Sequence, residues 1–322
     1  VNLKVPKLRK VTFETAVIER YKRREISVEE AMIEMYIAGV SVRRVEDITE
    51  ALWGTKVSPG TISNLNKKIY GQIEKWRNEP LKEHYTYVYL DGIWLKRTWG
   101  GEVKNISVLV AVGVNSEGFR EILGVAEGCK EDKASWSNFL RYLKNRGLQK
   151  VDLMVSDKSL GLVEIIAEFY PEAMWQRCMV HFYRNVFSCV PNNKVKEVAT
   201  MLKAIHAQEN IEEARRKKEM VISKLKEMKL SNASKIVNDG CEETFSYYSF
   251  PVEHWKRIRT NNGLERIMRE IRRRTRVVGS FPDGESALML VAARLRHVAS
   301  STWSERIYLN MTLLNGFEIA TA

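Results

Sequence analysis

The run 150–190, KVDLMVSDKSLGLVEIIAEFYPEAMWQRCMVHFYRNVFSCV, constrains the fold of this chain most strongly. An apolar segment, 151–155, is followed within two residues by Asp157. An amphipathic segment, 160–170, comes next, and a second β-rich segment, 174–180, closes the run. Strand, acidic residue, helix and strand in this order are typical of a βαβ unit. Because ligands of open α/β sheets bind outside the carboxyl ends of strands, Asp157 is predicted to lie at a functional edge.

The charge of the chain is basic and unevenly distributed. The 322 residues carry a formal net charge of +12, and two or three domains are expected at this length. Residues 254–306 contain twelve Lys and Arg against five Asp and Glu, so much of the excess lies there. Such a concentration favours a polyanionic partner, most commonly nucleic acid. A solubilising surface is the alternative.

Cellular location is predicted from two features. Four cysteines are scattered without a disulfide-like framework, which is typical of a reducing cytoplasm. No apolar run approaches the roughly 18 residues that a membrane span needs, and no secretory segment is visible. We therefore expect a cytoplasmic, nucleoid-associated protein without a membrane partner.

Residues 1–82 read as helical. The apolar spacing predicts helices over 12–24, 27–38, 41–53 and 61–76.

The last two of these helices are joined by a short turn containing glycine, which describes a helix-turn-helix. Ser58 before Pro59 is a strong start signal for the second helix. In that motif the second helix enters the major groove of DNA. A plain helical hairpin is the alternative. The residues that this helix would present to DNA are Thr61, Ser63, Asn64, Asn66, Lys67 and Lys68.

The hydrophobic period changes at residue 85. Three consecutive β runs, 85–94, 104–114 and 120–126, have short connections and predict an antiparallel meander. A helix is predicted over 134–145, before the βαβ unit. The order β-β-β-α-β-α-β is that of the ribonuclease-H-like fold, a mixed sheet flanked by helices.

The chain is predicted to be helical again after Pro191. Charged helices over 194–207 and 211–230 are interpreted as solvated faces without chemistry, an Arg-rich helix is predicted over 262–276, and another helix over 285–298. The overall prediction is α/β. It comprises a helical DNA-binding domain with the helix-turn-helix (1–82), the first part of a ribonuclease-H-like core (83–190), an all-helical insertion (191–250) and the C-terminal part of the core with the basic helix (251–322).

Three acids are predicted to meet in this fold. Asp91 lies within or at the end of the first strand, Asp157 ends the fourth, and Glu265 belongs to the basic helix after the insertion. The first and fourth strands are neighbours in a ribonuclease-H-like sheet. Three converging carboxylates repel one another, and Mg²⁺ resolves this repulsion because it prefers carboxylate oxygens. Two such ions activate an attacking oxygen and stabilise a leaving oxygen on phosphorus.

Each acid also has a structural interpretation. Asp91 and the following glycine form a dipeptide common in turns. Asp157 is a good cap for the helix that follows. Glu265 stands three residues after Asn262, as in a capping box. The combination of the three acids with the fold order and the basic helix favours catalysis.

Cys178 and His181 have the spacing of half a zinc site. No second pair has matching spacing, so a buried thiol and a histidine near the active site are preferred to structural zinc.

Four blocks carry a resemblance: LDGIWLKR around Asp91, VSDKSLGL around Asp157, WQRCMVHFYRN at 175–185 and RTNNGLERIMREIRRRTRVVGSFPD at 259–283. From about residue 12 to about residue 300 the sequence resembles bacterial insertion-sequence transposases of the Mutator type. The resemblance implies a DDE transposase whose metal-binding triad is Asp91, Asp157 and Glu265. It also implies at least a dimer, and it matches Cys178 and His181 to the family's Cys-x₂-His element.

Two positions depart from the family pattern. Lys158 follows the second acid where the family often has glycine, and Gly263 precedes the third where proline is common. Losing a proline frees the local backbone and is expected to soften the placement of Glu265.

The predicted reaction is Mg²⁺-dependent cleavage and strand transfer on double-stranded DNA, with Mn²⁺ able to replace Mg²⁺ and no small-molecule substrate. The substrates would be the terminal inverted repeats and target DNA. Arginine binds phosphate oxygens bidentately, which suits it to holding the DNA near the cut. The candidates are Arg269, Arg272, Arg273, Arg274 and Arg276.

Three alternatives stay open from the sequence. One is a catalytically inactive, transposase-derived DNA-binding regulator. Another is a structure-specific nuclease on the same fold, which would cut branched DNA without strand transfer. The third is a zinc protein.

Overall fold

The computed structural model describes residues 26–37, 42–54, 57–99, 102–128, 132–159, 161–278, 281 and 284–317. The chain divides into two compact units, Val1–Ile69 and Tyr70–Ala322. The four domain boundaries expected from the sequence stay predictions.

The first unit contains short helices. The helices predicted over 27–38 and 41–53 are confirmed. The helix predicted over 61–76 is also present, and it begins at Pro59 as its start signal indicates. Met32, Val45 and Val57 form a small buried cluster that joins two helices to the turn before the third. The helix predicted over 12–24 lies outside the described residues. The observed elements are α1 (Ile26–Ile37), α2 (Val42–Trp53) and α3 (Pro59–Arg77), and α3 continues into the second unit.

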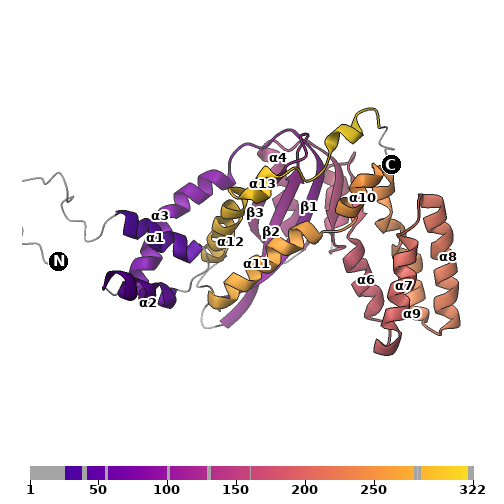
Figure 1. Cartoon of the computed structure of the whole chain (residues 1–322), viewed down its shortest axis with the longest axis horizontal. Helices are drawn as coiled ribbons and strands as arrows, with labels where there is room; N and C mark the ends of the chain where they lie inside the picture. The colour runs from indigo at the N-terminus through magenta and orange to yellow at the C-terminus, as the bar shows by residue number, and fades with distance from the viewer. Residues whose placement is uncertain are drawn as a thin grey trace, which may run out of the picture. The chain divides into compact units, whose positions relative to one another are not determined.

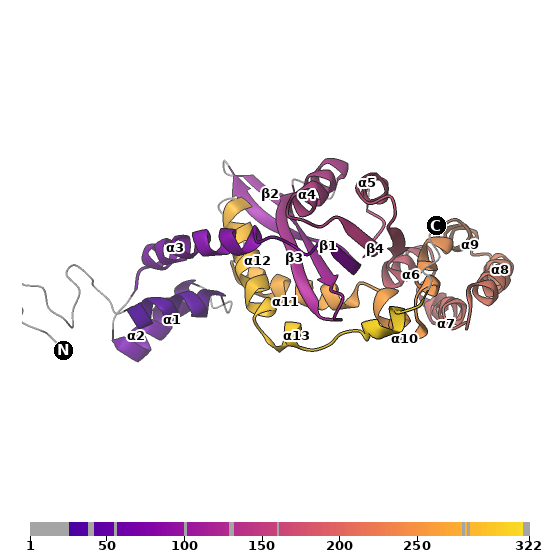
Figure 2. The same cartoon turned by 90° about the horizontal axis from the view of Figure 1, so that it is seen from above.

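A five-stranded mixed sheet is the centre of the second unit, which confirms the predicted α/β class (Figures 1 and 2). The first three strands form the predicted antiparallel meander, and the fourth and fifth add parallel to the first. The spatial order is β3-β2-β1-β4-β5. The strands are β1 (His84–Trp99), β2 (Glu102–Val114), β3 (Arg120–Gly128), β4 (Lys150–Ser156) and β5 (Met174–Arg177).

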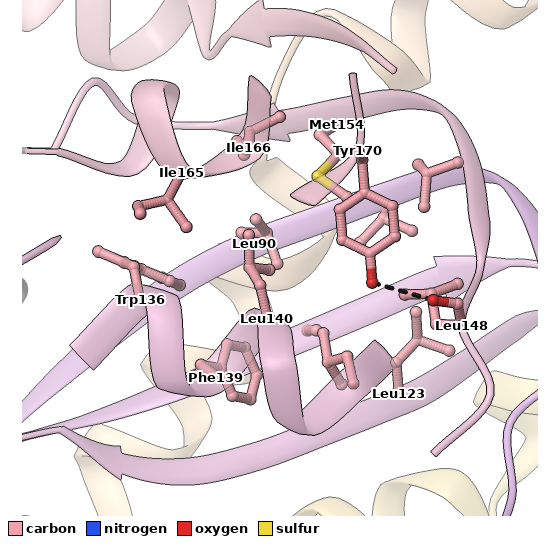
Figure 3. Packing of buried hydrophobic residues seen from close by; sticks show 14 of the residues in the cluster. Leu90, Leu123, Trp136, Phe139, Leu140, Leu148, Met154, Ile165, Ile166 and Tyr170 are labelled. Carbon is pink, nitrogen blue, oxygen red and sulfur yellow. Dashed lines mark hydrogen bonds between the residues drawn. The ribbon is translucent and has the colours of Figure 1, made fainter. Parts of the chain in front are cut away.

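Two helices cover one face of this sheet, α4 (Lys133–Asn145) and α5 (Leu162–Phe169). Asp132 caps the first of them by accepting a hydrogen bond from the Ser135 backbone. Figure 3 shows how the aromatic and aliphatic side chains of both helices interdigitate with those of the strands. The Tyr170 hydroxyl after α5 donates to the Leu148 carbonyl before β4, at 3.1 Å (Figure 3). This packing fixes the βαβ unit on the sheet.

Other helices, among them α11 (Asn262–Val278) and α12 (Gly284–Ala299), lie against the opposite face (Figure 2). The His254 Nδ1 and Tyr87 Oη atoms are 2.7 Å apart, which ties a short helix to β1. The predicted basic helix packs on β1, and the next helix packs mainly on β3. The sequence did not indicate the short helix separately. These elements also include α10 (Val252–Ile258) and α13 (Thr302–Glu305).

A separate helical layer follows β5 and contains the helices predicted over 194–207 and 211–230. Its apolar side chains form their own buried cluster, apart from the one between the sheet and α4. Within this cluster His206 is buried, between the Tyr183 hydroxyl at 2.8 Å and the Thr244 hydroxyl at 2.7 Å. The layer consists of α6 (Met179–Phe187), α7 (Val195–Ile205), α8 (Ile211–Glu227) and α9 (Ser231–Gly240).

The strand predicted over 174–180 is wrong at its end. β5 stops at Arg177, and residues from Met179 onward are helical, so His181 lies on α6 and not after a strand. Phe182 and Val186, four residues apart, are buried in the cluster of the helical layer. Packing of this helical stripe overrides the β propensity of the preceding residues.

No helix in the described ranges is both long and apolar enough to span a membrane.

Candidate functional site

The register between β1 and β4 places two of the predicted acids at one level of the sheet. The parallel ladder pairs Tyr89 with Val155. Two residues further along each chain come Asp91, still within β1, and Asp157, the first residue after β4. Neighbouring strands lie about 4.8 Å apart, so the two acids stand side by side at the carboxyl end of β4. The predicted adjacency of the first and fourth strands is confirmed.

The structural interpretations of these two acids are wrong. Asp91 is not in a turn, because β1 continues through it and pairs it with Val110. Its Oδ1 accepts a hydrogen bond from the Gly92 backbone at 2.9 Å. Asp157 does not cap α5, whose N-cap is Gly161. Its Oδ1 accepts from the adjacent Lys158 backbone at 2.7 Å.

Glu265 lies on the first turns of α11, which packs on β1. It shares with Asp91 a cavity of about 220 Å³. Asp157 is not among the residues that line this cavity. The lining consists of Asp91, His181, Arg184, Glu265, Met268, Arg269 and Arg272.

Two side chains from α6 approach the Glu265 carboxylate. His181 Nε2 lies 3.4 Å from Oε1, and Arg184 Nη2 lies 3.5 Å from Oε2. The Glu265 side chain is only 14 % exposed, and neither its Oε1 nor His181 Nδ1 has a hydrogen-bond partner among the described residues. A buried carboxylate oxygen without a donor is costly unless a ligand satisfies it.

Asn261 joins α11 to both the sheet and α6, and the sequence did not single it out. Its side-chain amide donates to the Leu90 carbonyl at 2.8 Å, and its backbone N–H donates to Cys178 Sγ at 3.3 Å. Cys178 N in turn donates to the Ser156 carbonyl at 2.7 Å. The sequence signal that could have indicated it is that Asn261 directly precedes another asparagine, Asn262, at the start of α11.

Cys178, His181 and Glu265 form a close group, with one ligand atom of each within 4.8 Å of the others. The i, i+3 spacing at the start of α6 brings the thiol and the imidazole to one side. Burial raises the pKa of the Cys178 thiol, so at neutral pH it is protonated. In the part of the chain that the structure describes, Asp91, Asp157 and Glu265 do not form a group as close as this.

The structure separates the predicted DNA-binding arginines. Arg269 and Arg272 line the Glu265 cavity, whereas the guanidinium of Arg273 pairs with Glu270 at 3.1 Å. On α3, Asn64 is exposed. The remaining predicted residues have side chains outside the described part; they are Thr61, Ser63, Asn66, Lys67, Lys68, Arg274 and Arg276.

The two positions that depart from the family pattern, Lys158 and Gly263, each lie next to other residues of the core. Lys158 Nζ pairs with Glu243, which also accepts from Arg177 at 3.0 Å, so the end of β4 is tied to the segment after α9. At Gly263 an added Cβ would lie 3.3 Å from the Tyr308 hydroxyl.

The chain belongs to the Mutator family of transposases. The model of that family, described as "Transposase, Mutator family", matches residues 1–305. This membership confirms the resemblance found in the four sequence blocks, and it makes the protein an enzyme of the transposase class.

Curated relatives agree with this family. The chain is 36% identical to the transposase for insertion sequence element ISRM5 of Rhizobium meliloti, over 97% of this chain and 78% of that protein. It is 35% identical to the transposase of IS256 in transposon Tn4001 of Staphylococcus aureus, over 96% of this chain and 80% of that protein. The transposase of IS1081 from Mycobacterium tuberculosis is also 35% identical, over 98% of this chain and 76% of that protein.

Proposed function

We propose that this protein is a DDE transposase that cleaves DNA at the ends of an insertion sequence and joins them to target DNA. Asp91, Asp157 and Glu265 would be its acids. The observation that carries the proposal is the β1–β4 register, which brings the first two acids to one level of the sheet, where the helix that bears the third packs on β1.

The sheet supports a ribonuclease-H-like core. A three-stranded antiparallel meander followed by two parallel strands, in the order β3-β2-β1-β4-β5, is the arrangement that this core requires. Helices on both faces and a helical layer between β5 and α11 agree with the same fold.

The residues present fit a divalent cation. Glu265 lines the same cavity as Asp91 and has a buried Oε1 without a hydrogen-bond donor, and the two aspartates offer only oxygen ligands, which Mg²⁺ and Mn²⁺ prefer. Asp91, Asp157 and Glu265 would hold the metal. When bound, Mg²⁺ would supply charge stabilisation and activation of oxygen for phosphoryl transfer.

The chain itself would position the DNA. Arg184, Arg269 and Arg272 line the cavity that contains Glu265 and would hold the phosphate to be cut, and His181 would orient Glu265 through its Nε2. The helices α2 and α3 would read the terminal inverted repeats as a helix-turn-helix. Because two element ends must be joined, the active form would be at least a dimer that works on chromosomal DNA.

A cleavage assay with the variant Asp157→Asn tests the proposal. We expect loss of cleavage and joining of end-containing DNA in Mg²⁺, by about 10³-fold or more, because one carboxylate ligand is removed. DNA affinity in a chelator should be unchanged.

The matched control is Asp152→Asn, the same substitution five residues earlier within β4, where the carboxylate pairs with His84. It should retain cleavage. Full activity of Asp157→Asn would remove this residue from the acid set. A wild-type protein that binds DNA but never cuts it would be a regulator, and cleavage of branched DNA without end sequences would identify a structure-specific nuclease.

The grouping of Cys178, His181 and Glu265 favours a second candidate, a zinc ion bound by sulfur, nitrogen and oxygen. Metal analysis of the purified chain distinguishes the two. Stoichiometric zinc that disappears in Cys178→Ser would assign the ion to this group, and its absence from the wild-type protein would reject it.

A further inference from the structure

Helix α11 separates two cavities. One flank carries Glu265, Arg269 and Arg272, which line the cavity described above. The other flank carries Arg266 and Glu270, which line a larger cavity of about 620 Å³. This division follows from the helical period, because residues three, four and seven apart share a side.

The larger cavity is strongly basic. Its lining includes one acid, Glu270, and that carboxylate already pairs with Arg273 and Arg294. No ion pair with a described carboxylate is found for any of the cavity's cationic residues. Those residues are Arg120, Lys256, Arg257, Arg259 and Arg266, which come from β3, α10, the segment after α10, and α11.

Aromatic rings hold two of these guanidinium groups. Arg120 lies 4.4 Å from the ring centre of Trp303 and 4.6 Å from that of Tyr308, and Arg257 approaches Tyr308 at 5.0 Å. The Arg120 Nε atom is buried and has no hydrogen-bond partner among the described residues. Burial lowers the pKa of Arg120; Tyr308 opposes this lowering, and the positive charge of Arg257 adds to it. Both guanidinium groups thus lie against the same Tyr308 ring, and neither pairs with a described carboxylate.

We propose that this cavity binds the phosphodiester backbone of a DNA strand, as a second DNA site on the opposite flank of α11 from Glu265. The proposal rests on the proposed function for the identity of the polyanion. Cations that come from four segments around an open space suit successive phosphates better than one small anion.

The test uses the full chain with the double variant Lys256→Ala and Arg266→Ala, because both side chains are exposed. DNA affinity is measured over a salt series in a chelator, so that the result does not depend on cleavage. Each lost phosphate contact should reduce the slope of log affinity against log salt by about one. We therefore expect a slope lower by about two and an affinity at low salt that is roughly tenfold weaker.

The matched control removes two arginines from the helical layer, Arg215→Ala and Arg216→Ala. Both side chains are exposed and already pair with Glu242 and Glu213. This control corrects for the loss of net charge. A double variant whose slope equals that of the control would overturn the proposal.

Measurements with two DNA substrates, end-containing DNA and unrelated DNA, identify which DNA the cavity binds. A loss confined to end-containing DNA assigns the cavity to the element end, a loss confined to unrelated DNA assigns it to the target, and an equal loss assigns it to both. Failure of the proposed function would give a different result. The wild-type protein would then not cleave DNA in Mg²⁺, but the double variant would still show a lower salt slope than the wild type in the chelator.

Discussion

The sheet and the helices position their acids by different means. Asp91 and Asp157 stand on neighbouring parallel strands, where a ladder of backbone hydrogen bonds fixes their level. Glu265 and His181 stand on α11 and α6, whose mutual position depends on a few side-chain and backbone contacts. The two aspartates are therefore held by regular structure, and the third acid by packing.

This difference teaches where the site is vulnerable. A slip by one residue in β4 would reverse every side chain on that strand, so the register is strongly specified. The position of α11 has no comparable protection. Asn261 contributes to it beside the buried apolar side chains of α11, because its amide and backbone reach β1 and α6 together.

The substitution Asn261→Ala tests whether packing positions Glu265, and it is expected to have the largest effect. Removing the amide leaves the Leu90 carbonyl without its donor and loosens α11, which costs about 1–3 kcal/mol of stability. Cleavage at saturating DNA should fall by as much as about 10²-fold, since small misplacements of catalytic groups are costly.

Urea unfolding and single-turnover cleavage measure these two quantities. The control is Asn238→Ala on α9, an exposed asparagine whose loss should change neither. If Asn261→Ala cleaves as fast as the wild type, packing at this position does not control Glu265.

The second prediction concerns acid pH and compares the helical layer with the sheet. Burial lowers the pKa of His206 to about 4, against the ordinary 6.5. The unfolded chain therefore binds a proton at His206 more readily than the folded chain does. The contribution of the neutral, buried imidazole to stability is complete above pH 6.5 and is lost as pH falls towards 4. Between pH 7 and pH 5 the loss should be about 2 kcal/mol.

Unfolding by urea at several pH values, for the wild type and His206→Gln, measures this contribution. The variant should show the weaker pH dependence. Hydrogen exchange should place the acid-induced opening in α7 and α8 before β1 and β4. Equal pH dependence of the two proteins would show that His206 is not the responsible group.

The smallest expected effect separates two adjacent arginines on α11. Arg272 lines the Glu265 cavity, whereas Arg273 pairs with Glu270. Arg272→Ala should reduce the salt slope of DNA binding by about one, and Arg273→Ala should change it little. A salt series by fluorescence anisotropy compares them. Equal slopes for the two variants would mean that the position relative to the cavity does not select the phosphate contacts.

Much of the sheet could be predicted because its signals are local. Alternating and continuous apolar runs indicated β1 to β4 within a few residues, and the two aspartates followed from the strand ends. The boundary between β5 and α6 could not be predicted in this way. The apolar residues there suit either a longer strand or the start of a helix. The helix forms because Phe182 and Val186 pack in a layer built by later helices.

The sequence by itself determined the elements, the acids and the basic character of α11, because periodicity, capping and charge are properties of short segments. Tertiary structure alone decided which residues share a cavity. Asn261 reaches Leu90 across 171 positions of the chain, and Arg120 meets Trp303 across 183. Such contacts depend on how distant segments pack, and no local pattern encodes which side of α11 faces the acids and which faces the basic cavity.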